Sequence, residues 1–375
     1  MNTENFSEVF ALHRFSEAVE EVNSRTPGDV EVTLHSISSG RKLNFSDFLS
    51  LISPSADSYL EELAIHSKEI TLERFGKAIQ LYTPLYLSNE CRSSCLYCGF
   101  SFENRIPRKT LSEEELRREA EILKDLGFRH ILVLTGEDYS KTPLKYIKRS
   151  IEILKEYFSS VSIEIYPMKE EDYSELISAG ADGLALYQET YHPDTYKEYH
   201  IRGVKKDMIF RLDGPDRGGR AGFRKIGIGA LLGLSAPLGE MYFLGLHASH
   251  LLGKYWRSQI QISLPRMRPA KGEFSKVIRV NDREFARFVF AFRIYFRDTG
   301  IVLSTRESAE FRDNLLGLGI TQMSAGSKTE PGGYQGLDTL EQFEIEDKRS
   351  LEEVMEMIRN RGYDPVLKDF DKAIL

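Results

Sequence analysis

Residues 79–98 read IQLYTPLYLSNECRSSCLYC, an apolar run typical of a buried strand that leads directly into three cysteines. Cys91, Cys95 and Cys98 are all the cysteines of the chain. Three thiols so close together cannot all pair as disulfides, and in a chain without export features they indicate metal ligands or redox groups. The stretch therefore excludes a disulfide scaffold and predicts a loop with metal or redox chemistry after a strand.

The CxxxCxxC spacing favours an iron–sulfur cluster over zinc. A closed structural zinc site needs four ligands, and no second cysteine pair exists in the chain. Three thiolates on one short loop suit three corners of a cubane cluster and leave the fourth iron open. A pure electron carrier would need a fourth cysteine, so the pattern favours chemistry at the open iron. Zinc and a non-catalytic iron–sulfur electron-transfer protein stay open as weaker alternatives.

The composition of the chain excludes several other classes. Of its 375 residues, 41% are hydrophobic and 29% charged, with a formal net charge of -7, which is enough apolar material for a large folded domain. Basic residues are spread along the chain, so we expect no nucleic-acid partner. No apolar run approaches the roughly 20 residues of a membrane span, and the N-terminus lacks an export pattern. We therefore expect no membrane association and a cytoplasmic location.

Short β-branched runs alternate with amphipathic helical runs, which is typical of βα units and a parallel sheet. One helical run starts at Ser112 and Glu115, a capping box, and stops at Gly127. Eight strands are predicted, over residues 79–89, 130–137, 161–167, 183–190, 225–234, 260–267, 301–307 and 320–325. Eight units predict a closed (β/α)8 TIM-type barrel.

The ends of the chain have a different pattern. Residues 1–75 are mostly helical and are predicted to form an N-terminal extension packed on a barrel of residues 76–330. Residues 331–375 are predicted to form a C-terminal helical tail packed on the same barrel.

In such a barrel, active sites lie at the C-terminal ends of the strands. The cysteine loop follows the first predicted strand. Polar and small residues occur at the predicted C-terminal ends of the later strands. They are Gly136, Glu137, Glu164, Tyr166, Glu189, Gly229, Arg306 and Ser324. We therefore expect one site on this rim.

Several segments in fixed order resemble a known family. The segment LYLSNECRSSCLYCGFSFENRIPRKTL (residues 85–111) resembles the radical S-adenosylmethionine enzymes, and within them the aromatic amino acid lyases, including the tyrosine lyases of thiamine thiazole biosynthesis. LTGE, YQETYH, RLDGPDRGGRAG, IGIGALLGLS, LSTRES and MSAGSKTEPGGY follow in the order of that family. The resemblance covers nearly the whole chain and implies a radical S-adenosylmethionine barrel.

The resemblance implies two cofactors, a 4Fe-4S cluster and S-adenosyl-L-methionine. Cys91, Cys95 and Cys98 would ligate the cluster. Six residues are expected at the second cofactor: Tyr97 at adenine, Glu137 at the amine, Glu164 at the ribose, Arg211 at the carboxylate, Gly229 in a strand that adenine approaches, and Glu189 on the rim. Arg217 and Arg220 compete with Arg211, and Thr135 stands where the superfamily has the first glycine of its GGE motif.

For the substrate, the resemblance points to an arginine that clamps a free amino acid carboxylate. Arg306 is the candidate, because a guanidinium makes two parallel charge-assisted bonds to a carboxylate. Ser324 is expected to add a hydrogen bond and Tyr86 to form a wall of the pocket. The alternatives are an ion pair of Arg306 with Glu307 or Glu310, a loop hydroxyl and a packed tyrosine.

Three histidines were considered for other roles. His247 and His250 are three residues apart on a predicted helix, but without a third ligand they favour an interior helix pair over a metal site. His192, near Glu189, and the helix histidines are candidate proton carriers, and the sequence does not choose between them.

The resemblance implies that the chain uses a 5'-deoxyadenosyl radical to cleave the Cα–Cβ bond of L-tyrosine, giving 2-iminoacetate (dehydroglycine) and p-cresol. Implied partners are the thiazole synthase (ThiG) that consumes the imine and a flavodoxin or ferredoxin reductant. A tyrosine lyase of hydrogenase cofactor assembly is disfavoured, because no cysteine follows Cys98 to hold a second cluster. A lyase acting on tyrosine or tryptophan in another cofactor pathway stays open.

Overall fold

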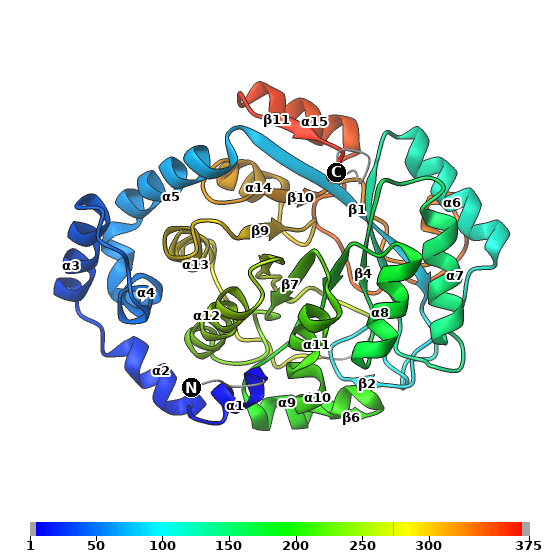
Figure 1. The fold of residues 1–375 in the computed structure, drawn as a ribbon, viewed down its shortest axis with the longest axis horizontal. Helices are drawn as coiled ribbons and strands as arrows, with labels where there is room; N and C mark the ends of the chain where they lie inside the picture. Colours follow the sequence, from blue (N-terminus) through cyan, green and yellow to red (C-terminus); the bar gives the residue numbers. More distant parts are fainter. Residues whose placement is uncertain (1–4, 273, 370–375) are drawn as a thin grey trace.

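A closed ring of parallel strands forms the centre of the molecule (Figure 1). The computed structural model describes residues 5–272 and 274–369. In ring order the strands are β1 (Ala78–Ser88), β3 (His130–Thr135), β4 (Ser160–Glu164), β5 (Gly183–Ala185), β7 (Lys225–Gly229), β8 (Gln259–Ser263), β9 (Gly300–Leu303) and β10 (Gln322–Ser324). The last strand pairs with the first, in the register Leu81 to Met323, and closes the ring. The predicted (β/α)8 barrel is confirmed.

Several strands end earlier than predicted. β5 stops at Ala185 although the apolar run continues towards Thr190, and β7 stops at Gly229. Leu231 and Leu234 beyond β7 are buried, but under loops at the barrel mouth and outside the named strands. An apolar run indicates that residues are buried, but not that they belong to a strand. The strand lengths predicted from apolar runs were therefore too long.

Helices on the outside of the ring connect the strands. They are α6 (Glu113–Asp125), α7 (Leu144–Leu154), α8 (Glu170–Ala179), α11 (Gly214–Ala221), α12 (Pro237–Lys254), α13 (Asp282–Tyr295) and α14 (Ala309–Leu315). The predicted capping box is present: the Ser112 side chain accepts the Glu115 N–H, and the Glu115 carboxylate accepts the Ser112 N–H. Gly127 follows this helix with a φ of 104°, a conformation that favours glycine.

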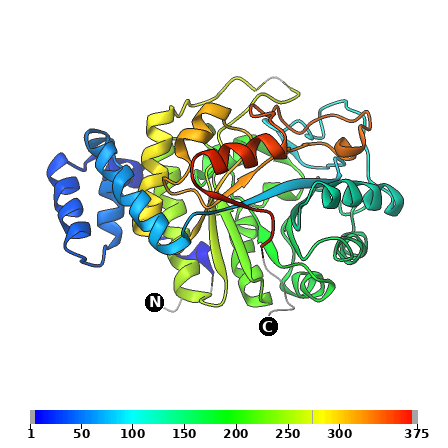
Figure 2. The same ribbon diagram turned by 90° about the horizontal axis from the view of Figure 1, so that it is seen from above.

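Most of residues 5–75 lie in helices on one side of the barrel (Figure 2). They are α1 (Phe6–Phe10), α2 (Phe15–Asn23), α3 (Pro27–Ser38), α4 (Phe45–Ile52), η1 (Pro54–Tyr59) and α5 (Leu60–Phe75). α5 packs on α13, and α2 packs on α12. The buried ring of Phe48 lies 5.1 Å from that of Phe292, so apolar contact joins these helices to the barrel. The division of the chain near residues 75 and 330 stays a prediction.

Short elements complete the fold. They are β2 (Ser94–Cys95), α9 (Pro193–Tyr199), β6 (His200–Arg202), η2 (Val204–Lys206), α10 (Met208–Leu212), η3 (Gly333–Gln335), α15 (Leu351–Asn360) and β11 (Asp364–Val366). α15 is the expected C-terminal helix, whereas β11 was not predicted and pairs with the start of β1. Three residues that include Pro365 carry too little pattern to indicate a strand. Among the described residues, no helix is both long and apolar enough to span a bilayer.

Candidate active site

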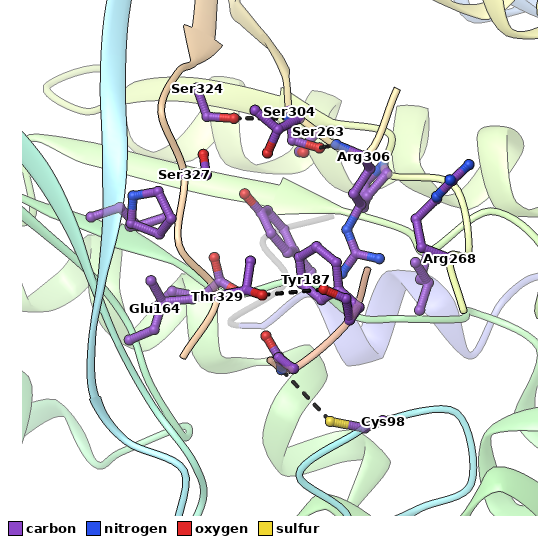
Figure 3. Close-up of a pocket in the computed structure, with 18 of the residues that line it drawn as sticks. Cys98, Glu164, Tyr187, Ser263, Arg268, Ser304, Arg306, Ser324, Ser327 and Thr329 are labelled. Atoms are coloured by element: carbon purple, nitrogen blue, oxygen red, sulfur yellow. Dashed lines mark hydrogen bonds between the residues drawn. The ribbon is translucent and has the colours of Figure 1, made fainter. Parts of the chain in front are cut away.

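The predicted rim surrounds a cavity of about 970 Å³, including its opening to solvent. Figure 3 shows Cys98, Glu164, Tyr187 and Arg306 around it. Of the predicted site residues, Tyr86, Tyr97, Cys98, Glu164, Glu189, Arg306 and Ser324 line the cavity. Cys91, Cys95, Glu137, Arg211 and Gly229 do not line it. The barrel thus brings seven predicted residues from distant parts of the chain to one space.

The cysteine loop follows β1 and is held from two sides. Its Ser94–Cys95 segment pairs with β6, and the N–H of Arg92 donates to the carbonyl of Glu137 at 3.1 Å. A Cβ on Gly136 would lie 2.2 Å from the carbonyl oxygen of Glu90. The glycine of the TGE segment is therefore needed for close approach of β3 to the loop.

The loop fits the predicted cluster in its donor set. All three thiols are free, and burial raises the pKa of Cys91 to about 12 and that of Cys95 well above its usual value. No three His, Cys, Asp or Glu side chains in the described part of the chain converge on a single metal ion. A cubane does not require such convergence, because each thiolate binds a different iron. The three free thiols of the loop are the ligand type that such a cluster takes.

A buried group of two cations and two carboxylates lies beside the cysteine loop. Arg211 donates to Glu137 at 3.1 Å and to Glu189 at 3.4 Å. Lys205 forms a second ion pair with Glu189 at 2.6 Å. Burial opposes the charge of Glu189, but Lys205 and Arg211 outweigh it and lower the pKa of this carboxyl to about 2. The group thus pairs two basic side chains with two acidic ones.

The backbone at Glu189 is strained. With φ 71°, it is the one non-glycine residue with positive φ among the described residues. The Glu189 carbonyl accepts the N–H of Leu231 at 2.8 Å, and the next two residues, Thr190 and Tyr191, donate to the buried carboxylate of Glu240. Such strain persists when neighbours overdetermine it, and it aims the Glu189 carboxylate into the rim.

Tyr97 stands on the cysteine loop with its hydroxyl 2.8 Å from Nε2 of His200. The other ring nitrogen of His200 lies 2.8 Å from the carbonyl oxygen of Tyr196. Burial lowers the pKa of His200 to about 3, so its imidazole is neutral. A neutral imidazole that donates to a carbonyl accepts from Tyr97, and this fixes the Tyr97 ring at the cavity edge.

Glu164 ends β4 and faces the cavity. Among the described residues, none forms a hydrogen bond or an ion pair with its carboxylate. Burial and the nearby negative charge of Glu189 raise the pKa of Glu164 to about 7. A carboxyl without a partner in a cavity is suited to accept a ligand's hydroxyl protons.

We expect Glu164→Gln to flatten the pH dependence of stability in the cofactor-free protein. A folded pKa above the usual 4.5 means that the folded state binds the proton more tightly, so stability falls as pH rises from about 4.5 to 7. In urea unfolding, the free energy of unfolding of the wild type should fall by about 2 kcal/mol more than that of the variant over this pH range. Glu310→Gln, on the exposed start of α14, should follow the wild type; equal slopes for Glu164→Gln and wild type would contradict the shift.

Arg306 is partly buried and forms no ion pair with an acidic side chain of the described residues. The predicted alternative of an ion pair with Glu307 does not occur, because Glu307 pairs with Arg266, and no recorded ion pair of the described residues includes Arg306. Its guanidinium carbon lies 3.4 Å from the centre of the Phe343 ring, and burial lowers its pKa. The guanidinium also donates to the carbonyl of Arg266 at 3.5 Å. A cation whose contacts are a ring face and a backbone carbonyl has no negative charge beside it and suits an anion.

Ser324 and Tyr86 take up fixed positions on the wall. The Ser324 hydroxyl accepts the N–H of Thr305 at 2.9 Å, which orients the strand end that carries Arg306. The Tyr86 hydroxyl donates to Gln342 at 2.7 Å. Both side chains are buried at the cavity, as expected for wall residues.

Other candidates lie away from the cavity. Arg217 donates to the carbonyls of Met168 and Phe210, and Arg220 pairs with Glu170 at the surface. Of the three competing arginines, Arg211 alone joins the rim carboxylates. A Cβ on Gly229 would lie 2.4 Å from the carbonyl oxygen of Ser263, so strand packing explains this glycine and the arrangement offers no support for the expected adenine contact.

The three histidines have structural partners. His247 lies 2.9 Å from the Tyr191 hydroxyl, and His250 lies 2.8 Å from Asp216. His192 caps α9. None of the three lines the cavity.

Comparison with known proteins now adds to this geometry. Residues 85–234 match the model of the radical SAM superfamily, and residues 263–364 match the Biotin and Thiamin Synthesis associated domain. The chain is 42% identical to 2-iminoacetate synthase of Escherichia coli (strain K12) over 94% of this chain and 93% of that one. The chain belongs to the 2-iminoacetate synthase family. It is also 41% identical to the 2-iminoacetate synthase of Salmonella typhimurium, over 93% of this chain and 92% of that one.

A solved structure shares the fold of this 2-iminoacetate synthase family member. The FeFe-hydrogenase maturase HydG from Carboxydothermus hydrogenoformans matches with a TM-score of 0.88 and 32% identity, over 97% of this chain and 85% of that one. The family is one of radical SAM lyases, which agrees with the fit of the cysteine loop to a multi-iron group. Radical SAM membership implies S-adenosylmethionine and a 4Fe-4S cluster as its cofactors.

The sequence analysis did not predict several residues that line the cavity. They are Tyr82, Tyr187, Lys205, Ser263, Arg268, Thr329, Gln342 and Phe343. Tyr187 lies inside a predicted strand run and Lys205 in a polar loop, so neither carried a distinguishing pattern. Gln342 and Phe343 come from the segment after the barrel, and nothing local in their sequence points to the cavity.

Proposed function

We propose that this protein cleaves the Cα–Cβ bond of L-tyrosine to 2-iminoacetate and p-cresol for thiamine thiazole synthesis. The observation that carries the proposal is Arg306, a partly buried guanidinium without an acidic partner in the described chain. It faces the same cavity as Cys98 in a chain of the 2-iminoacetate synthase family. A free amino acid supplies the carboxylate that this site lacks.

The cofactor residues of the proposal are those named by the sequence. Bound together, the cluster and S-adenosylmethionine supply a 5'-deoxyadenosyl radical that abstracts hydrogen from the substrate. Cys91, Cys95 and Cys98 hold the cluster, and Tyr97 contacts adenine. Arg211 binds the cofactor carboxylate, and four further residues bind the rest of the cofactor: Glu137, Glu164, Glu189 and Gly229. The ion pairs of Arg211 with Glu137 and Glu189 support this assignment, because they preorganise opposite charges for a zwitterionic amino acid group.

On the substrate side, Arg306 clamps the tyrosine carboxylate, Ser324 adds a hydrogen bond and Tyr86 closes the wall. Radical chemistry depends on placement, since an error of about 1 Å can cost on the order of a hundredfold in rate. The buried Tyr86 and Ser324 side chains support a pocket wall from which water is excluded.

The direct test is anaerobic incubation of reconstituted protein with reductant, S-adenosylmethionine and either tyrosine or tryptophan. We expect deoxyadenosine and p-cresol with tyrosine, and no indole product with tryptophan. Deoxyadenosine without consumption of either amino acid would overturn the substrate assignment and leave the radical assignment intact. Absence of deoxyadenosine would favour a non-catalytic iron–sulfur protein.

Two protein partners belong to the proposal: a thiazole synthase (ThiG) that takes the imine and a flavodoxin or ferredoxin that reduces the cluster. Exposed Leu96 and Phe102 flank the cysteines, and the Arg202 guanidinium carbon lies 3.6 Å from the centre of the Phe102 ring. This apolar and basic surface suits an acidic electron donor. The cytoplasmic location stays a prediction.

We expect Arg202→Glu to slow reduction of the cluster by flavodoxin about tenfold at low salt, because it reverses a charge at the proposed contact. Stopped-flow absorbance of the cluster measures the rate. Reduction by dithionite should be unchanged, which controls for damage to the loop. An unchanged flavodoxin rate would remove Arg202 from the contact.

A further inference from the structure

The segment after the barrel crosses the cysteine loop at Gln342. The N–H of Gly99, next to Cys98, donates to the Gln342 carbonyl at 3.1 Å, and the Gln342 N–H donates to the carbonyl of Thr329 at 2.9 Å. A Cβ on Gly99 would lie 2.4 Å from the Gln342 carbonyl oxygen. The two backbones are therefore in direct contact, and Gln342 has a fixed position relative to Cys98.

The side chain of Gln342 joins a sulfur to a tyrosine. Its Nε2 donates to Sγ of Cys98 at 3.6 Å, and its Oε1 accepts from the Tyr86 hydroxyl at 2.7 Å. In Figure 3 the dashed line to Cys98 marks the first of these bonds. Among the hydrogen bonds of the described residues, this is the one in which a side-chain N–H reaches a cysteine sulfur.

The amide can take only one orientation once the sulfur binds iron. A thiolate has no proton and acts only as an acceptor, so the NH2 end must face it. The carbonyl end is then left for Tyr86, whose hydroxyl can donate. Tyr86 therefore locks the amide in the orientation that serves the sulfur.

We propose that Gln342 is a positioning residue that raises the reduction potential of the cluster through its bond to Cys98. The inference rests on the proposed function, because it requires the cluster. Negative charge on the sulfurs grows when the cluster is reduced, and an N–H donor stabilises that charge. Gln342 therefore favours the reduced state.

The test is a redox titration of the reconstituted protein followed by electron paramagnetic resonance. Gln342→Leu removes the donor with little change in length. At a fixed applied potential we expect its ratio of reduced to oxidised cluster to fall about tenfold, which is 59 mV for a one-electron couple. Iron and sulfide content normalises each sample.

Gln342→Glu gives a second, nearly isosteric test. Its carboxylate keeps an acceptor for Tyr86 but offers the sulfur no donor, so the potential should fall at high pH. Protonation at low pH restores a donor, so the potential should move back towards wild type. The new carboxylate also acts on the cluster by its charge, so the loss of the donor alone is read from the uncharged Gln342→Leu variant, and the pH dependence of Gln342→Glu tests that position 342 lies at the cluster.

Gln335→Leu is the matched control. Gln335 lies on the same segment, but its amide bonds to the carboxylate of Glu119 and the carbonyl of Glu115. The reduction potential of the cluster in Gln335→Leu should equal that of the wild type. An unchanged potential in both Gln342 variants, or an equal shift in Gln335→Leu, would overturn the inference while leaving the proposed lyase activity standing. Wild-type protein without a cluster signal would overturn both.

Discussion

Arg306→Lys is expected to lower kcat/KM for tyrosine about a hundredfold, with most of the loss in KM. The partly buried guanidinium stacks on Phe343 and has no acidic partner in the described chain. A lysine keeps the charge but cannot make two parallel bonds to a carboxylate, and it loses the stacking on the ring. Losing such a desolvated pair costs about 2–5 kcal/mol. Initial rates of p-cresol formation over a range of tyrosine concentrations measure the effect.

Arg268→Lys provides the matched control for this loss. Arg268 lines the same cavity, but it already pairs with Glu346. We expect a loss of less than about threefold, because the proposal gives Arg268 no contact with the substrate carboxylate and Glu346 already neutralises its charge. Both variants should keep the iron content of wild type and the formation of deoxyadenosine without tyrosine. Unaltered tyrosine affinity in Arg306→Lys would rule out the clamp.

Arg211→Leu is expected to lower the free energy of unfolding by about 3–5 kcal/mol and to abolish binding of S-adenosylmethionine. The substitution leaves Glu137 buried with the hydroxyl of Ser93 and removes one of two cations from Glu189. Removing one partner of a buried ion pair leaves an uncompensated charge, which is more costly than the pair was favourable. Urea unfolding and calorimetric titration with the cofactor measure the two effects.

The stability difference should depend on pH in a defined direction. Glu189 has a folded pKa of about 2, below its usual 4.5, so its contribution is fully present above about pH 4.5. This contribution is lost as pH falls towards 2, and the gap between wild type and Arg211→Leu should shrink over that range. Arg220→Leu breaks a surface pair with Glu170 and should cost less than about 1 kcal/mol. A cost as large as that of Arg211→Leu would contradict the role given to the buried group.

The barrel was predictable because its signals are local. Each strand is a short β-branched run, and parallel strands that are buried on both faces have near-continuous apolar sequences. The pairs β2–β6 and β1–β11 were not predictable, because β2, β6 and β11 are segments of two or three residues whose pairing depends on where the barrel holds them. The same dependence explains why β5 and β7 end early.

Some residues of the candidate site were also predictable from the sequence, whereas the choice between others needed the structure. The spacing of Cys91, Cys95 and Cys98 predicts iron–sulfur chemistry from eight residues alone, because three soft ligands on one loop have few other uses. The choice of Arg211 over Arg217 and Arg220 required the structure, since all three have the same side chain on neighbouring turns. What separates them is which carboxylates lie within reach.

By itself the sequence determined the cysteine loop, the eight strands and their order, and hence the barrel and its active end. These depend on periodicity and on spacing between near neighbours. Only the tertiary structure decided that Arg306 has no acidic partner, that Glu189 is strained between two cations, and that Gln342 reaches Cys98. Each of these depends on contacts across more than fifteen residues of chain, and the closed barrel determines which of them form.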